Sequence, residues 1–183
     1  YEEKKAHAIL TLLTLGASRA FSFNSRLSKW YDARGYPDPL FTDNNYAPKK
    51  MFGDNNLSAP RRGYKQSLSH VLESYEELAS YDVDGSIEIY SQDAATLSSE
   101  VSKGDIDIAV VDPPYYSSIM YSELSEGYYV IQKPYLEDVF PDLFASTLPN
   151  KDDEAVANPS RFEKIAGDSQ SKKELADKHY ESK

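Results

Sequence analysis

Asp112, Pro113, Pro114 and Tyr115 are the residues of this sequence best suited by type and spacing to chemistry. The carboxylate of Asp112 accepts hydrogen bonds, and the backbone carbonyls beside it are held rigid because each proline ring fixes its φ angle. Tyr115 adds an aromatic ring to this pair of acceptors. The same tetrapeptide also occurs in ordinary turns after strands, where it is a rigid loop with a half-buried tyrosine. Tyr116, one of 15 tyrosines, is interpreted as a packing residue.

The residues directly before the tetrapeptide predict the element that positions it. A short run of mostly β-branched side chains is typical of a strand buried on both faces of a parallel sheet, and it contains Ile106, Ile108, Ala109, Val110 and Val111. The prolines cannot donate ladder hydrogen bonds, so they end this strand. Asp112 is therefore expected at the carboxyl end of a strand, where open α/β sheets bind ligands.

The hydrophobic pattern predicts a chain of alternating helices and strands. Helices are expected over residues 3–31, 64–81, 94–103, 121–132 and 135–145 and from about Ser171, and a strand over 87–90. The last two short helices are separated at Pro134. This order indicates an incomplete α/β domain with a parallel sheet and right-handed crossovers.

Composition divides the chain into three segments. Residues 1–63 contain a long helix and a loop rich in Pro and Asn, residues 64–145 contain the α/β core, and residues 146–183 form a polar segment that we expect to be a lid or a mobile tail. The chain begins with Tyr and stops within a helical pattern, so we expect it to be part of a longer protein.

The sequence around and after the tetrapeptide extends the motif. The run DPPYYSSIMYSELSEGYYV, followed by PDLFASTLPNKDDEAVANPSRF, resembles a prokaryotic family of adenine-specific DNA methylases, and the N-terminal NSRLSKW is similar as well. Only residues 35–63 match poorly. The resemblance implies an incomplete Rossmann-like class I methyltransferase domain with an added N-terminal helix and long loops, and S-adenosyl-L-methionine as the cofactor. Because some members are encoded with anti-phage systems, it also implies a link to restriction or phage defence.

The resemblance assigns roles to individual residues. The Asp112 carboxylate and the Pro113 carbonyl would accept the two hydrogens of an exocyclic amine, whose lone pair is otherwise delocalised into the ring. Pro114 would keep the loop rigid, and Tyr115 would stack on a base flipped out of the duplex. Asp93 would lie beside the cofactor's adenine. A simpler interpretation, that Asp93 caps a helix starting at Ala94, explains it comparably well.

Some family features are missing from this sequence. It has no counterpart of the glycine-rich loop that holds the methionine end of the cofactor, and the strands expected after the catalytic one are absent. We therefore expect most of the cofactor pocket to lie outside these 183 residues, and we expect the chain alone not to methylate. The rest of the same polypeptide, or other subunits of a defence system, would complete it.

Charge is distributed unevenly. The net charge of −10 comprises +4 in residues 1–63, −13 in 64–150 and −1 in 151–183. DNA binding requires cations for the phosphates. The candidates lie in the basic segment and are Arg26, Lys49, Lys50, Arg61 and Arg62. For each of them, a solvated surface charge is at least as good an interpretation.

Composition also limits the function classes. The chain has no cysteine, which excludes disulfides, cysteine-based zinc sites and thiol nucleophiles. The histidines His7, His70 and His179 lack ligand spacing, so no metal site is expected. No apolar run is long enough to span a bilayer and no signal peptide is visible, so we expect a cytoplasmic protein.

Two alternatives to adenine N6 methylation stay open. The motif does not fix the acceptor, which could be cytosine N4, RNA or a protein amide. The chain could also be a non-catalytic module whose basic first third binds DNA or a partner.

Overall fold

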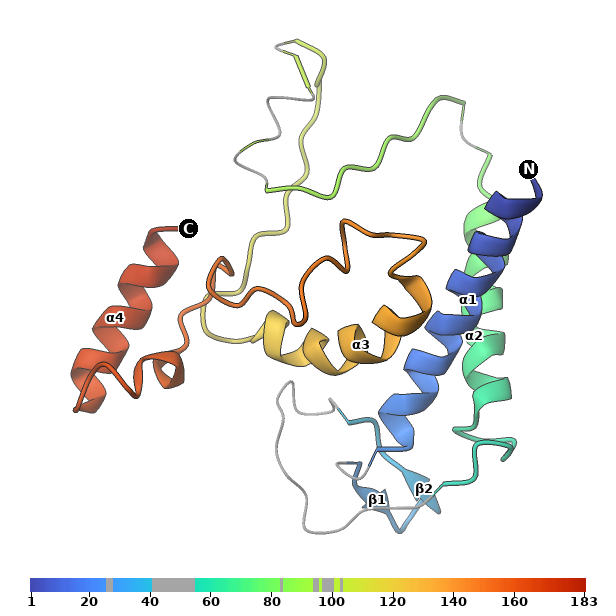
Figure 1. The fold of residues 1–183 in the computed structure, drawn as a ribbon, viewed down its shortest axis with the longest axis horizontal. Helices are drawn as coiled ribbons and strands as arrows, with labels where there is room; N and C mark the ends of the chain where they lie inside the picture. The colour runs from blue at the N-terminus through green and yellow to red at the C-terminus, as the bar shows by residue number, and fades with distance from the viewer. Residues whose placement is uncertain (26–27, 41–54, 83, 94–95, 97–100, 103) are drawn as a thin grey trace.

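The chain folds mainly into helices. The computed structural model describes residues 1–183 except 26–27, 41–54, 83, 94–95, 97–100 and 103 (Figure 1). In chain order, the elements are α1 (Glu2–Phe23), β1 (Trp30–Tyr31), β2 (Tyr36–Pro37), α2 (Tyr64–Ala79), α3 (Tyr121–Leu136), the 3-10 helix η2 (Pro159–Phe162) and α4 (Ser169–Glu181). No helix in the described part of the chain has the length and apolar character needed to cross a membrane.

Helices α1 and α2 lie side by side and pack closely through small residues (Figure 1). A Cβ atom on Gly16 would lie 3.2 Å from the Cα of Leu68, so glycine permits this approach. The hydroxyls of Thr14 and Ser18 are buried and donate to carbonyls one turn earlier in α1. The α1 side that is buried thus carries small side chains, whereas the larger Leu13 is 41% exposed.

Helix α3 packs against α1, and a side-chain hydrogen bond of 3.1 Å from Gln132 to Ser18 joins them. The prediction of two helices separated at Pro134 was wrong, because α3 continues through this proline to Leu136. Pro134 lies in the last turn of α3, where its missing N–H costs the helix one hydrogen bond, to the carbonyl of Val130.

The predicted α/β fold is wrong. In the described residues, the sheet consists of β1 and β2 alone, which pair antiparallel with Tyr31 opposite Tyr36. A Rossmann-like methyltransferase domain requires a parallel sheet of several strands. Residues 106–111 are instead irregular and exposed, with Val110 exposed to 93%, and 87–90 are likewise irregular.

The reason for this error is physical. A β-branched run forms a buried strand only when neighbouring strands satisfy its backbone and cover both its faces. The described residues place no strand beside 106–111. Local pattern therefore gave the wrong element.

The first helix is also shorter than predicted. It ends at Phe23 rather than near residue 31, because the Asn24 side chain and N–H bond back to the carbonyls of Ala20 and Phe21. The N–H of Leu40 donates to the carbonyl of Ser22 over 2.7 Å, which returns the β1–β2 hairpin to the end of α1.

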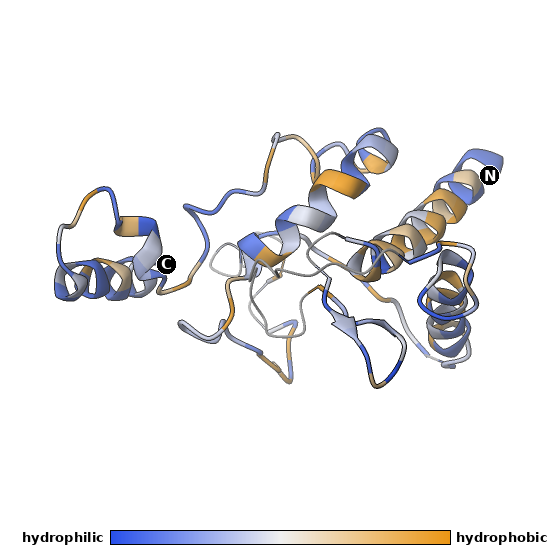
Figure 2. Cartoon of the chain, turned by 90° about the horizontal axis from the view of Figure 1, so that it is seen from below, coloured by the Kyte–Doolittle hydropathy of each residue, from blue (hydrophilic) through white to orange (hydrophobic). Residues whose placement is uncertain are grey.

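The predicted helices over 64–81 and from about Ser171 are confirmed as α2 and α4. The N-cap Asp168 starts α4 by accepting from the Ser171 N–H. Helix α4 is mostly hydrophilic and lies away from α1 and α2 (Figure 2). The helix predicted over 94–103 falls largely outside the described residues, and the division into three segments stays a prediction.

Candidate functional site

The structure brings Asp112 and Tyr115 together on an exposed loop. The Tyr115 hydroxyl donates to Oδ1 of Asp112 over 3.0 Å, and the N–H of Ser118 closes a turn on the Tyr115 carbonyl at 2.9 Å. Pro113 and Pro114 connect the two side chains and are also exposed. In the described part of the chain, Oδ2 of Asp112 and the Pro113 carbonyl accept no hydrogen bond. Both acceptors are thus available to a ligand.

Tyr116 fixes the loop to the C-terminal helix α4. Its ring meets the Tyr180 ring edge-on with 5.0 Å between centroids, and its hydroxyl donates to Asp177. This hydrogen bond to a carboxylate raises the pKa of the Tyr116 phenol. Tyr180 also donates a long hydrogen bond of 3.4 Å to the Pro114 carbonyl. Tyr116 therefore packs, as predicted from the sequence, and it does so against α4.

A second contact fixes the same loop from residues 154–158. The N–H of Ala157 donates to the Tyr116 carbonyl over 3.1 Å, and Val156 beside it is fully buried. Tyr116 has a φ of +51°, a left-handed conformation that costs a non-glycine residue energy. The DPPYY and EAVANP stretches, which carry the resemblance separately in the sequence, are thus in direct contact.

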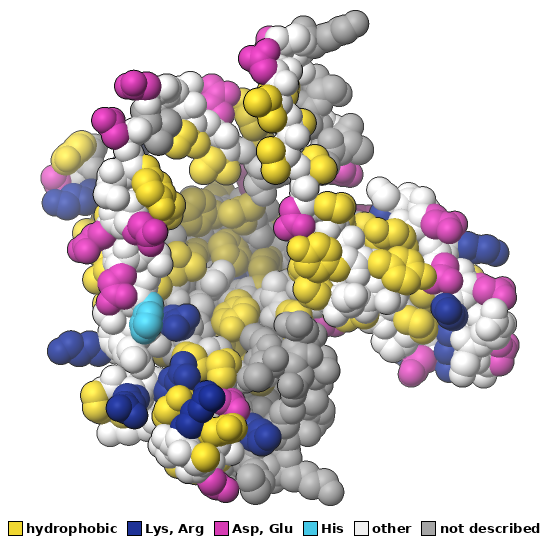
Figure 3. Space-filling view, turned by 180° about the vertical axis from the view of Figure 1, so that it is seen from behind, with side chains coloured by type: hydrophobic (Ala, Val, Ile, Leu, Met, Phe, Trp, Pro, Cys, Tyr) yellow, Lys and Arg dark blue, Asp and Glu magenta, His cyan; other side chains and the backbone are white. Residues whose placement is uncertain are grey.

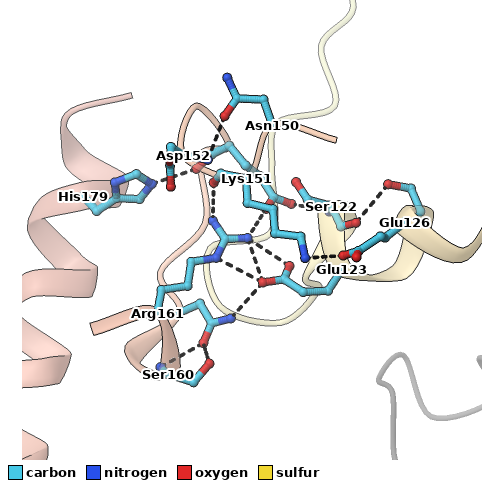
Figure 4. Close-up of polar contacts among 12 residues, drawn as sticks. Ser122, Glu123, Glu126, Asn150, Lys151, Asp152, Ser160, Arg161 and His179 are labelled. Carbon is cyan, nitrogen blue, oxygen red and sulfur yellow. Dashed lines mark hydrogen bonds and ion pairs between the residues drawn. The ribbon is translucent and has the colours of Figure 1, made fainter. Parts of the chain in front are cut away.

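A group of charged side chains beside this contact joins α3 to the residues before α4. We call it the Arg161 cluster, and it consists of Arg161, Glu123, Glu154, Lys151 and Glu126 (Figure 4). Arg161 forms hydrogen bonds of 2.9 to 3.1 Å with both carboxylate oxygens of Glu123, and it also pairs with Glu154. Lys151 pairs with Glu126.

Two more hydrogen bonds extend the cluster toward the loop and α4. Glu154 Oε1 accepts from the N–H of Ser122 at 2.9 Å, at the start of α3, and the Glu154 carbonyl lies 3.0 Å from Nε2 of His179 (Figure 4). Residues 117–120 are all that separate the loop from α3. The cluster therefore joins α3, which follows the loop, to residues 154–158, which contact the loop.

Partial burial and opposite charge act together on these groups. Burial alone would raise the pKa of the Glu123 carboxyl, but the hydrogen bonds and charge of Arg161 hold that pKa below its usual value. Burial opposes the charge of Arg161 in the same way, yet the two glutamates raise the pKa of Arg161. The pairing thus favours the ionised forms of Glu123 and Arg161.

Sequence reasoning did not find the role of Arg161 or Glu154. Both lie in the quoted stretch that ends EAVANPSRF, so the resemblance contained them without assigning them a function. Their partner Glu123 lies 38 residues before Arg161 in the chain. No local spacing rule predicts such a pairing.

The proposed cofactor residue Asp93 lies on a different exposed segment. Ser91, Gln92 and Asp93 are all exposed, and the Asp93 carbonyl accepts from the N–H and hydroxyl of Thr96. The described residues around Asp93 do not enclose an adenine ring. The cofactor role of Asp93 stays a prediction, and we assign no reaction step to S-adenosylmethionine.

Of the tentative nucleic-acid residues, Arg61 and Arg62 lie in the turn before α2. Arg26, Lys49 and Lys50 are outside the described residues. The structure brings Arg61 and Arg62 together with Arg19 in one pocket. The start of α2 lies beside the C-terminal end of α1, away from the N-terminus of the chain (Figure 1). Among the residues that the structure describes, no three His, Asp or Glu side chains gather to hold a metal ion.

No protein-family model, no curated protein and no solved structure matches this chain. The resemblance to adenine-specific DNA methylases therefore stays a prediction from the residues quoted above.

Proposed function

We propose that this chain supplies the amine-binding part of an S-adenosylmethionine-dependent DNA methyltransferase that acts on adenine N6. The observation that carries this proposal is the exposed loop in which Asp112 and Tyr115 are in contact while Oδ2 of Asp112 and the Pro113 carbonyl remain open in the described structure. A flipped adenine presents an amino group with two hydrogens, and these two acceptors match them.

The chemistry of the loop follows from hydrogen bonding. The lone pair of an aromatic amine is delocalised into the ring, so the nitrogen is a poor nucleophile. Acceptance of one hydrogen by Asp112 and the other by Pro113 draws the nitrogen toward tetrahedral geometry and frees that pair. Tyr115, which is 50% exposed, has ring surface available for stacking on the base. Tyr116 and the Arg161 cluster hold the loop in place.

Substitution of Asp112 tests this proposal. In the protein expressed from the complete gene, Asp112→Ala should abolish transfer of a labelled methyl group to adenine-containing DNA. Asp107→Ala, an exposed aspartate on the same irregular segment, is the matched control and should leave transfer intact. Retained transfer by Asp112→Ala would refute the assignment.

The acceptor is tested with the same assay. Oligonucleotides that contain cytosine without adenine, RNA of the same sequence, and peptides with Gln or Asn replace the DNA in parallel reactions. We expect transfer to adenine-containing DNA alone. The 183-residue chain by itself should transfer no methyl group to any of these substrates. Measurable transfer by the chain alone would contradict the expectation that most of the cofactor pocket lies outside it.

One observation favours a second candidate, a non-catalytic DNA- or partner-binding module. Arg19, Arg61 and Arg62 of the basic first third line one pocket. This candidate predicts that the complete protein binds DNA without any methyl transfer. We place either form of the protein in the cytoplasm, where it meets its DNA.

A further inference from the structure

A pocket rich in arginine opens between α1, the β1–β2 hairpin and the start of α2. It has a volume of about 260 Å³ and is lined by Arg19, Tyr36, Arg61, Arg62, Gln66 and His70. The space-filling view shows Lys and Arg side chains gathered at this end of the molecule beside a histidine (Figure 3). This concentration of positive charge contrasts with the net charge of −10 of the whole chain.

The backbone of Arg62 is held in a conformation that the sequence alone would disfavour. Its φ is +60°, in the left-handed region, which is unfavourable for a non-glycine residue. Its N–H donates to Gln66 over 2.7 Å, and its carbonyl accepts from the side chains of Asn24 and Asn55 at 3.3 and 3.1 Å. Three side chains thus fix one strained residue, which is the pattern of a preorganised binding site.

The Arg62 side chain is fixed as well. Its guanidinium lies 4.3 Å from the centroid of the Phe23 ring and 4.7 Å from that of the Tyr36 ring. A guanidinium close to aromatic rings is attracted to them and still carries several N–H donors. Interaction with Arg62, together with Arg34, lowers the pKa of the Tyr36 phenol.

The pocket arginines lack acidic partners in the described structure. Arg161, Lys133, Lys151 and Lys183 each pair with a carboxylate there, whereas Arg19, Arg61 and Arg62 do not. Glu73 and Glu77 line a different groove, with Arg19 and His70. Cations fixed at a pocket whose described lining has no carboxylate favour an external anion.

The hairpin supplies a second arginine-aromatic pair next to the first. Tyr31 is the ladder partner of Tyr36, and the Arg34 guanidinium lies 4.7 Å from the centroid of the Tyr31 ring. Arginine stacked on tyrosine therefore occurs on both strands, one beside the other. Neighbouring cations of this kind suit an anion that repeats its charge, as the phosphodiester backbone does.

We propose that this arginine pocket binds consecutive phosphates of a nucleic-acid backbone. This inference deepens the proposed function. It rests on that function only in taking the nucleic acid to be the substrate DNA. Bidentate hydrogen bonds from guanidinium groups to phosphate oxygens provide the recognition, and they carry no sequence information.

Binding of fluorescein-labelled DNA to the 183-residue chain tests this proposal by fluorescence anisotropy. Arg19→Gln and Arg61→Gln each remove one pocket charge and leave Arg62, which packs between two rings, untouched. Each should weaken binding roughly threefold and reduce the slope of log affinity against log salt concentration by about one. Lys164→Gln, an exposed cation near the other end of the chain, is the control and should do neither. Circular dichroism checks that each variant is folded.

Three results would overturn the proposal. The first is equal binding by wild type, Arg19→Gln and Arg61→Gln. The second is an equal loss with Lys164→Gln, which would show only general electrostatic attraction. The third is arginine-dependent binding of inorganic phosphate, or of vesicles containing phosphatidylserine, without binding of the oligonucleotide.

This test is independent of methyl transfer. Asp107→Ala, at an exposed residue outside the lining of the pocket, should keep wild-type anisotropy. If Asp112→Ala retains methyl transfer while Arg61→Gln weakens binding, the proposed function fails and the phosphate site stands. If Asp112→Ala abolishes methyl transfer while Arg61→Gln binds DNA as wild type does, the phosphate site is refuted and the proposed function stands.

Discussion

Replacement of Arg161 by methionine should destabilise the chain strongly. Methionine keeps much of the side-chain volume but leaves Glu123 and Glu154 facing each other without their shared cation. Removal of one partner from a fully buried ion pair costs about 3 to 5 kcal/mol. The side chains of Arg161, Glu154 and Glu123 are 15%, 12% and 28% exposed, so solvent screens part of this penalty. We expect a loss of about 2 to 3 kcal/mol.

Urea denaturation followed by circular dichroism measures this loss. With a slope of about 2 kcal/mol per molar urea, the midpoint should fall by about 1 to 1.5 M. Lys183→Met is the control, because its pair with Asp153 is 3.0 Å long but the aspartate is 74% exposed. Exposed pairs contribute about 0 to 1 kcal/mol. Equal midpoints for Arg161→Met and Lys183→Met would refute the structural role given to the Arg161 cluster.

The ion pair between Arg161 and Glu123 predicts how the stability of the folded chain changes with pH. Arg161 lowers the pKa of Glu123 in the folded chain, so the folded state favours the ionised carboxylate more than the unfolded state does. This contribution is fully present above about pH 4.5, the ordinary value for glutamate, and it disappears as the pH falls through the lower folded pKa. The Arg161→Met variant should lose less stability than wild type between pH 5 and 3, as measured by urea midpoints. An identical fall in both proteins would contradict the pairing.

Two further predictions concern single side chains. Gly63→Ala should destabilise the start of α2 by about 2 kcal/mol or more, since the new Cβ would lie 2.3 Å from the carbonyl oxygen of Ala59, whereas Gly167→Ala meets no atom within 4 Å and should change the thermal midpoint little. A larger effect at Gly167 would show that this backbone arrangement is wrong. Tyr115→Phe removes the hydrogen bond to Asp112 but keeps the ring, so methyl transfer by the complete protein should persist, while Tyr115→Ala should reduce it. Loss of transfer in both variants would mean that the hydroxyl, and not the stacking face, is required.

The sequence was sufficient where structure depends on local pattern. Helix α2 follows from its three- and four-residue apolar spacing, and α4 begins where Asp168 caps it. The end of α1 was missed because it depends on Asn24 and on the hairpin that returns to Ser22. The strand over 106–111 was wrong because a strand requires partners that no local pattern can supply.

The candidate site was predictable in part. Asp112 and Tyr115 are three residues apart, and the structure brings them into contact. The loop's attachments come from Ala157 and Tyr180, 41 and 64 residues beyond Tyr116, and nothing in the spacing of these residues signals that they meet. Sequence reasoning therefore found the acceptors and missed what holds them.

The proposed adenine N6 methylation is tested most directly in the cells that carry the gene. Host DNA is sequenced for N6-methyladenine in a strain that lacks the gene and in the same strain complemented with the wild type, with Asp112→Ala or with Asp107→Ala. We predict that wild type and Asp107→Ala restore N6-methyladenine at a recurring sequence and that Asp112→Ala does not. Methylation that is unchanged by deletion of the gene, or restored by Asp112→Ala, would contradict the proposal.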